Sequence, residues 1–367
     1  MPLGVPCHFQ DSDRRCWATD GRGVCAAPRR GASALVQHAD MAELCRRDPP
    51  HGFRKLCLES DAKDALRMIS SLRDPARCRY KTCALVGSGG SLPGAREGHE
   101  IDKHDAVLRL NFAPDAQQAA RMKHAPHRHE PTWIADVGAR TTWRIMAMEG
   151  YGYLKHYPRF WLGRPKGHGN HANMSGIPQQ PLLAIACHTP TRGLGRCRSE
   201  RLRQVFDHPE SASYLVNPLL LHEWSERYFR MVKNQMVLST GMWAIAFASQ
   251  LCGETHVYGF GNGGCLSACY HYYDCGETRG SAGYNQTFFF TNPKSSGGYH
   301  NFSAQAKVLK RLAAERVIVP HWGTCEQNRG DAPAEFVNRA QPSRPRIGRG
   351  RRKAALRRTG VYTRRSW

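Results

Sequence analysis

The chain has 367 residues, of which 41% are hydrophobic and 23% charged, so it holds enough apolar material for one large globular domain rather than a wholly disordered protein. Lys and Arg exceed Asp and Glu by 53 to 30, and residues 339–367 carry 11 of the basic residues and no acidic one. No run of 18 apolar residues occurs, so the sequence predicts no membrane-spanning helix.

The first half of the chain predicts a polar extension followed by alternating helices and strands. Residues 1–60 are interpreted as an N-terminal stem or poorly ordered extension, because their beginning is polar and lacks periodicity. A helix is predicted over Asp61–Leu72, where apolar residues recur at helical spacing. The strands predicted after it are Thr82–Val86, Ala106–Asn111, Thr132–Val137 and Leu182–Cys187.

The second half continues this alternation. Its predicted elements are the strand Tyr214–Asn217, the helix Leu219–Val232, the helix Gly241–Leu251, the strand Thr255–Phe260, the helix Ser303–Glu315 and the strand Arg316–Val319. Because strands alternate with helices, we expect one α/β domain over residues 61–330, with a mainly parallel sheet covered by helices on both faces.

Residues 331–367 are interpreted as a basic, disordered tail, since they show no hydrophobic periodicity. Such a tail can also bind nucleic acid or an anionic membrane. No aromatic residue is interleaved with its basic residues before Tyr362, so we expect no nucleic-acid partner.

The 14 cysteines and three N-x-S/T sequons favour an oxidising secretory compartment. The sequons begin at Asn173, Asn285 and Asn301. Residues 1–30 contain no apolar signal-peptide core. Either the protein is soluble, or an N-terminal anchor is missing from this chain.

A glycine-rich turn directly follows the strand at 82–86, at the sheet edge where backbone N–H groups are free to bind a ligand. Its spacing, Gly87-x-Gly89-x-x-Leu92, lacks the third glycine of the dinucleotide-binding fingerprint. It also lacks the Gly-Lys-Ser/Thr of a P-loop, so a dehydrogenase or a P-loop kinase is disfavoured. The remaining readings are a nucleotide held by other contacts and a plain tight turn.

Two further segments place polar groups at the same predicted edge. Asn111 ends the next strand, where it either binds a phosphate, cytidine or ribose or simply caps a turn. Ser239, Thr240 and Gly241 begin a helix, and this helix N-terminus offers either an anion site or an ordinary N-cap.

The segment after that helix–strand unit contains residues suited to acid–base chemistry. His271 and His300 carry imidazoles with a pKa suited to proton transfer. The chain has 18 histidines, so the alternative interpretation of each is a structural or surface residue. Cys265, Cys269 and Cys275 lie nearby, but their spacing matches no zinc finger or ribbon and favours disulfides. The D-x-D at Asp11 precedes every predicted strand and is interpreted as chance.

Taken in chain order, these segments resemble the four sialyl motifs of the eukaryotic sialyltransferase family. The similar stretches are 83–90 through 101–114 for the large motif, 136–142 for its far end, 238–243 through 252–260 for the small motif, 271–274 for the third motif and His300 for the start of the last. The resemblance covers about residues 78–320. Four motifs in the right order are far more specific than any one of them.

The resemblance implies a variant GT-A, Rossmann-like fold that needs no metal or other cofactor. It also implies an inverting displacement that moves sialic acid from CMP-sialic acid to a hydroxyl group of a glycan on a glycoprotein or glycolipid. The expected partners are therefore the CMP-sugar donor and the glycan acceptor. The expected location is the Golgi lumen or membrane, with membrane association through a missing anchor or the basic tail.

The resemblance also assigns roles to residues. Gly87, Ser88, Gly89 and Asn111 are expected to hold CMP, while Ser239, Thr240 and Gly241 receive the donor's carboxylate. His300 is the expected general base for the acceptor hydroxyl, and His271 stabilises the departing phosphate. A disulfide is expected between Cys83 and Cys252.

Two positions depart from the family pattern, which usually has Asn at the position of Ser88 and Glu at that of Gln305. Two alternatives therefore accompany the main hypothesis. One is an enzyme of the same fold that uses another CMP-ulosonic acid such as CMP-Kdo. The other is a catalytically weak, sialyltransferase-like binding protein.

Overall fold

The computed structural model describes residues 32–48, 51–71, 80–111, 113–115, 133–148, 182–187, 197, 199–206, 213–229, 238–260, 271–272 and 300–322. The chain divides into two compact units, Met1–Gly330 and Asp331–Trp367, and every described residue belongs to the first. No helix among these residues is long and apolar enough to cross a membrane. The predicted basic tail lies outside the described residues.

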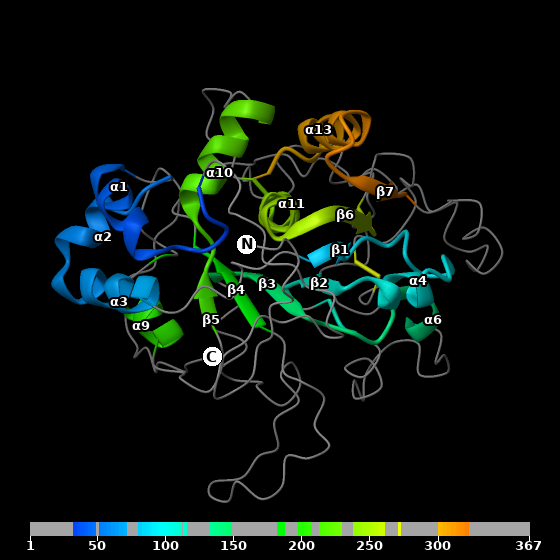
Figure 1. Cartoon of the computed structure of the whole chain (residues 1–367), viewed down its shortest axis with the longest axis horizontal. Coiled ribbons are helices and arrows are strands. Elements are labelled where there is room, and N and C mark those ends of the chain that lie inside the picture. Colours follow the sequence, from blue (N-terminus) through cyan, green and yellow to red (C-terminus); the bar gives the residue numbers. More distant parts are fainter. Residues whose placement is uncertain are drawn as a thin grey trace, which may run out of the picture. The chain divides into compact units, whose positions relative to one another are not determined.

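The described part of the chain is built on a parallel sheet of seven strands (Figure 1). The strands are β1 (Tyr80–Val86), β2 (Ala106–Leu110), β3 (Trp143–Ala147), β4 (Leu182–Ala186), β5 (Ser213–Leu215), β6 (Cys252–Tyr258) and β7 (Val319–His321). Their spatial order is β5-β4-β3-β2-β1-β6-β7. The chain therefore runs outward from β1 to β5 and then returns to the other side of β1, so the strand order reverses between β1 and β6.

Helices cover both faces of this sheet, as the alternating pattern predicts. One face packs against α10 (Pro218–Trp224), α11 (Thr240–Leu251) and α13 (Phe302–Ala314), seen above the sheet in Figure 1. The other face packs against α4 (Gly98–Lys103) and α6 (Trp133–Val137) near β1 and β2. Towards β4 and β5 it packs against α1 (Met41–Arg46), α2 (Arg54–Leu58), α3 (Ser60–Ser71) and α9 (Ser199–Phe206).

Most of the predicted elements are present with shifted ends. The helix predicted over Leu219–Val232 is α10 followed by a π-helical turn, Ser225–Phe229. The last strand begins at Val319 rather than Arg316. Arg316 has a φ of 56°, and the N–H of Val317 donates to Leu312 O, so these residues form the turn that ends α13.

One predicted strand is wrong. Residues 133–137 form the helix α6, and the strand at this place in the sheet is β3, Trp143–Ala147. The helix is held by the buried Asp136, whose carboxylate accepts hydrogen bonds from the N–H groups of Gly94 and Arg96 at 2.9 Å each. A short apolar run has no periodicity that separates a strand from a helix, so these long-range contacts decide the structure.

The predicted boundary between a stem and the globular domain is also too late. The N–H of Val36 donates to Leu215 O at 2.9 Å, next to an antiparallel bridge between Leu35 and Val216. Leu44 of α1 is fully buried in the core, and a disulfide joins Cys45 of that helix to Cys57 of α2. Residues from about 34 onward therefore belong to the globular unit, because their apolar side chains, though widely spaced, are buried under β4 and β5.

Candidate active site

The turn after β1 lies where the strand order reverses. The N–H of Gly87 donates to Tyr258 O at 2.7 Å, and the N–H of Gly89 donates to Gly259 O at 3.0 Å. A Cβ atom at Gly87 would lie only 2.6 Å from Gly259 O, so the close approach of the two strand ends requires glycine there. In open parallel sheets, ligands bind outside the carboxyl ends of the strands at such a switch point. The predicted nucleotide turn therefore occupies the expected ligand position of the fold.

Asn111 follows β2 at the same edge, where its side-chain oxygen has a structural role. Its φ is 42°, in the left-handed region that Asn tolerates. Its Oδ1 accepts a hydrogen bond from the N–H of Ala147 at 3.1 Å, which caps the end of β3. Among the described residues, none accepts a hydrogen bond from its Nδ2. The predicted cap is therefore present, and the amide N–H groups remain available to a ligand.

The N-terminus of α11 brings Ser239, Thr240 and Gly241 to the same edge. A Cβ atom at Gly241 would lie 2.9 Å from Phe260 Cε1 and 3.7 Å from Leu110 Cδ1, which places this helix end beside the ends of β6 and β2. Ser239 occupies the N-cap position, but its side chain makes no capping bond. Its hydroxyl group instead donates to Oε1 of Gln305.

This hydrogen bond changes the role expected of Ser239. A hydroxyl group has one proton, and here that proton points at Gln305, so it is not directed at an anion. The backbone N–H groups at positions 240 and 241 have no acceptor among the described residues. Together with the positive end of the helix dipole, they can bind a carboxylate or phosphate.

The N-terminus of α13 carries His300. Asn301 is the N-cap of this helix, and its Oδ1 accepts a hydrogen bond from the N–H of Ala304 at 2.9 Å. His300 directly precedes the cap and is half-buried, with its ring 5.7 Å from that of Phe302. Because Gln305 in the first turn contacts Ser239, the N-termini of α13 and α11 meet at the carboxyl edge.

His271 is held near the turn after β1 by its neighbour Tyr272. The N–H of Tyr272 donates to Ser88 O at 2.9 Å, and its phenol group donates to Pro114 O. Tyr272 is 2% exposed, and this burial raises the pKa of its hydroxyl group. The half-buried His271 is thus held next to the turn that contains Ser88.

Two buried arginines support this edge, although neither is among the site residues predicted from the sequence. Arg144 donates through Nη1 to Asn111 O at 2.8 Å and to Ala113 O at 3.0 Å. Arg109 donates through Nη2 to Val137 O at 2.6 Å, and both arginines are 0% exposed. In the sequence, both can be recognised as an Arg within an otherwise apolar strand. Burial of a charged side chain is unfavourable unless hydrogen-bond partners compensate for the lost hydration, so such an Arg indicates a specific structural role.

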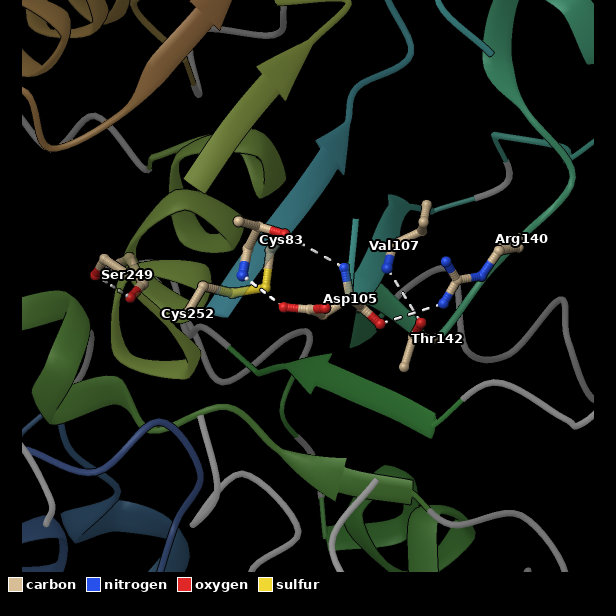
Figure 2. Close-up of a disulfide and its surroundings, with 9 residues drawn as sticks. Cys83, Asp105, Val107, Arg140, Thr142, Ser249 and Cys252 are labelled. Atoms are coloured by element: carbon tan, nitrogen blue, oxygen red, sulfur yellow. Dashed lines mark hydrogen bonds between the residues drawn. A yellow bond between two sulfur atoms is a disulfide. The ribbon is translucent and has the colours of Figure 1, made fainter. Parts of the chain in front are cut away.

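The disulfide expected between Cys83 and Cys252 is present, with Cα atoms 5.9 Å apart. Figure 2 shows it joining β1 to the start of β6, near Asp105. Cys252 is also the C-cap of α11, so the bond ties the far end of that helix to β1. It therefore fixes the helix from the end opposite to Ser239 and does not line the ligand edge.

Three histidines form a cluster: His104 in the segment before β2, His256 on β6 and His321 at the end of β7. His256 Nδ1 is 3.0 Å from His321 Nε2, and His104 Nε2 is 3.0 Å from the hydroxyl oxygen of Tyr258. Burial lowers the pKa of all three imidazoles, that of His104 to about 4. The cluster is therefore neutral in the folded protein near pH 7, whereas an unfolded histidine has a pKa of about 6.5.

Carboxylates border this cluster. Glu97 Oε2 lies 3.2 Å from His321 Nδ1, and Glu254 Oε1 lies 3.5 Å from His256 Nε2. Glu100 raises and Arg140 lowers the pKa of His104, but burial and the neighbouring imidazoles outweigh Glu100. No three His, Cys, Asp or Glu side chains among the described residues are placed to hold a metal ion. Residues 273–274 of the third motif and Cys265, Cys269 and Cys275 lie outside the described residues.

A model of glycosyltransferase family 29, the sialyltransferases, matches residues 36–317. The chain therefore belongs to this family. The match includes residues 36–60, in agreement with the packed N-terminal helices.

Curated relatives include members that form three different linkages. Mouse CMP-N-acetylneuraminate-beta-galactosamide-alpha-2,3-sialyltransferase 2 is 28% identical over 256 residues, which are 68% of this chain and 59% of that protein. Human alpha-2,8-sialyltransferase 8E is 25% identical over 269 residues, 72% and 61% of the two chains. A human alpha-N-acetyl-neuraminyl-2,3-beta-galactosyl-1,3-N-acetyl-galactosaminide alpha-2,6-sialyltransferase is 26% identical over 271 residues, 69% and 77%. The chain thus spans less than two thirds of the first two relatives.

A crystal structure of a mammalian sialyltransferase in complex with Gal-beta-1-3GalNAc-ortho-nitrophenol superposes with a TM-score of 0.47 at 17% identity, covering 81% of this chain and 92% of that one.

Proposed function

We propose that this protein transfers sialic acid from CMP-sialic acid to a hydroxyl group of a glycan. One observation carries the proposal beyond family membership. The hydrogen bond between Ser239 and Gln305 brings the segment of His300 to the helix N-terminus suited to the donor's anion. That helix end lies beside the switch point, where the turn at Gly87 occupies the position at which open parallel sheets bind ligands.

The proposed reaction is a single inverting displacement. The acceptor hydroxyl oxygen forms a bond to the anomeric carbon while the bond from that carbon to the phosphate oxygen breaks. The phosphate leaves as CMP with the bonding electron pair, and His300 takes the hydroxyl proton as general base. His271 is placed beside the nucleotide turn, where it stabilises the negative charge of the departing phosphate.

The donor site is proposed to bind anions mainly through backbone N–H groups. The donor carries a phosphate and a carboxylate, and the N-terminus of α11 offers a positive dipole end and N–H donors at positions 240 and 241. We propose on this basis that transfer needs no added metal ion. Treatment with EDTA should leave the rate unchanged, and a loss of activity restored by a divalent cation would contradict this.

The linkage and the acceptor are left to experiment, because the relatives' names cover α2,3-, α2,6- and α2,8-transfer. The disulfides suit an oxidising compartment, and the Golgi lumen is the proposed location.

The test is a transfer assay with CMP-Neu5Ac and CMP-Kdo against acceptors that end in galactose, GalNAc or sialic acid. The wild-type protein should transfer from CMP-Neu5Ac to at least one of them. His300→Ala should bind CMP with unchanged affinity and lose most of the transfer rate. Preference for CMP-Kdo would assign the other donor, and CMP binding without turnover in both proteins would identify a binding protein instead.

A further inference from the structure

The contact between Ser239 and Gln305 joins segments that lie 66 residues apart in the chain. Ser239 stands at the N-cap of α11, and Gln305 lies in the first turn of α13. The Gln305 side chain is buried, at 5% exposure, although its amide group is polar. Burying an amide without a partner is unfavourable, so the hydrogen bond to the Ser239 hydroxyl explains how this polar residue is accommodated.

The same contact determines where His300 lies. His300 precedes the N-cap of α13, and the N–H of Gln305 donates to the carbonyl oxygen of Asn301 at 2.9 Å. The first turn of α13 is therefore a short, hydrogen-bonded unit that contains Gln305 and continues directly into His300. A shift of this turn relative to α11 would move the imidazole relative to a donor bound at the N-terminus of α11.

We propose that Gln305 is a positioning residue, which accepts the Ser239 hydroxyl proton and thereby holds the His300 segment in place over the donor-binding end of α11. The inference rests on the proposed function and deepens it, because it assigns the alignment of base and donor to one hydrogen bond. Gln305 itself does not touch the reacting atoms. It also sets the orientation of the Ser239 hydroxyl group, whose single proton is used in this hydrogen bond.

The hydrogen bond can be tested with variants that keep or remove the acceptor oxygen. Gln305→Met has a similar length and volume without an acceptor amide, whereas Gln305→Glu keeps an oxygen that can accept from the hydroxyl group. Ser239→Ala removes the donor from the other side, and the double variant completes a thermodynamic cycle. Lys307→Met, at an exposed position of the same helix, is the matched control.

The measurement is kcat and KM for sialic acid transfer, with the number of CMP sites per chain counted by titration calorimetry. Gln305→Met should lower kcat/KM by about 5- to 150-fold, the range for a buried hydrogen bond whose partner is left unsatisfied. The kcat/KM of the double variant should lie within about 3-fold of that of the less active single variant, because both substitutions remove the same hydrogen bond. Gln305→Glu should stay within about 3-fold of wild type, since a carboxylate is tolerated in the first turn of a helix.

Several results would overturn the inference. They are wild-type kinetics in Gln305→Met, a double variant whose loss equals the product of the two single losses, or a Gln305→Glu variant as impaired as Gln305→Met. A fall in the number of CMP sites that matches the fall in rate would show that Gln305 only maintains the fold. If the wild-type protein transfers no sugar from any CMP donor, the proposed function itself fails, an outcome that is separate from these.

Discussion

The N-cap of α13 offers a direct test of how the helix end that carries His300 is held. Asn301 accepts a hydrogen bond from the N–H of Ala304, and replacing it with Ala leaves that N–H without its partner. Loss of such a cap costs about 1 kcal/mol of stability. For a folded unit of this size, this corresponds to a fall in Tm of about 2–4 °C. The first turn should also fray, so kcat should fall together with Tm.

Asn301→Ser is the matched control, because Ser caps a helix about as well as Asn. Both substitutions remove the sequon at this position, so a difference between them cannot come from glycosylation. Differential scanning calorimetry and the transfer assay should place Asn301→Ser near wild type and Asn301→Ala below it in both Tm and kcat. Equal losses in the two variants, or no loss in either, would refute the role of the cap.

Three further predictions concern the nucleotide turn, the disulfide and the histidine cluster. Gly87→Ala would place a Cβ atom 2.6 Å from Gly259 O; it should cost about 1–3 kcal/mol of stability and weaken CMP binding about 10-fold, whereas an unchanged Kd in calorimetry would contradict this. Replacing both Cys83 and Cys252 with Ala removes a cross-link between residues 169 apart, and the urea midpoint should fall by the equivalent of about 4–5 kcal/mol; an unchanged midpoint would show that the cross-link adds no stability. The pKa of His104 is about 4 in the folded protein and about 6.5 when unfolded. The free energy of unfolding should therefore have its full value above pH 6.5 and decrease as the pH falls towards 4. His104→Gln should flatten this fall in Tm against pH, and a slope equal to that of wild type would contradict the cause.

Local patterns in the sequence predict the elements that line the candidate site. The apolar run at 82–86 ends in glycines, and that at 106–110 ends in Asn111, so both predicted strands are correct within a few residues. The helix from 241 is likewise confirmed, because small and apolar residues follow a Ser-Thr start. In each case the signal lies within ten or so neighbouring residues.

Other features depend on contacts between distant segments and leave little local trace. Residues 133–137 are apolar enough for a strand but become a helix through the buried carboxylate of Asp136. Leu44 is one of several widely spaced apolar residues whose burial depends on strands more than 130 positions later. The hydrogen bond from Ser239 to Gln305 joins two helix ends that no short-range pattern connects.

The central claim is that CMP binds between the turn at Gly87 and the N-terminus of α11, with the imidazole of His300 facing it. A crystal structure of the protein with CMP tests this most directly. The account predicts a phosphate within hydrogen-bond distance of the N–H groups at 240 and 241, and the His300 ring on the open side of the nucleotide. CMP bound elsewhere on the molecule, or a His300 ring turned away from it, would contradict the account.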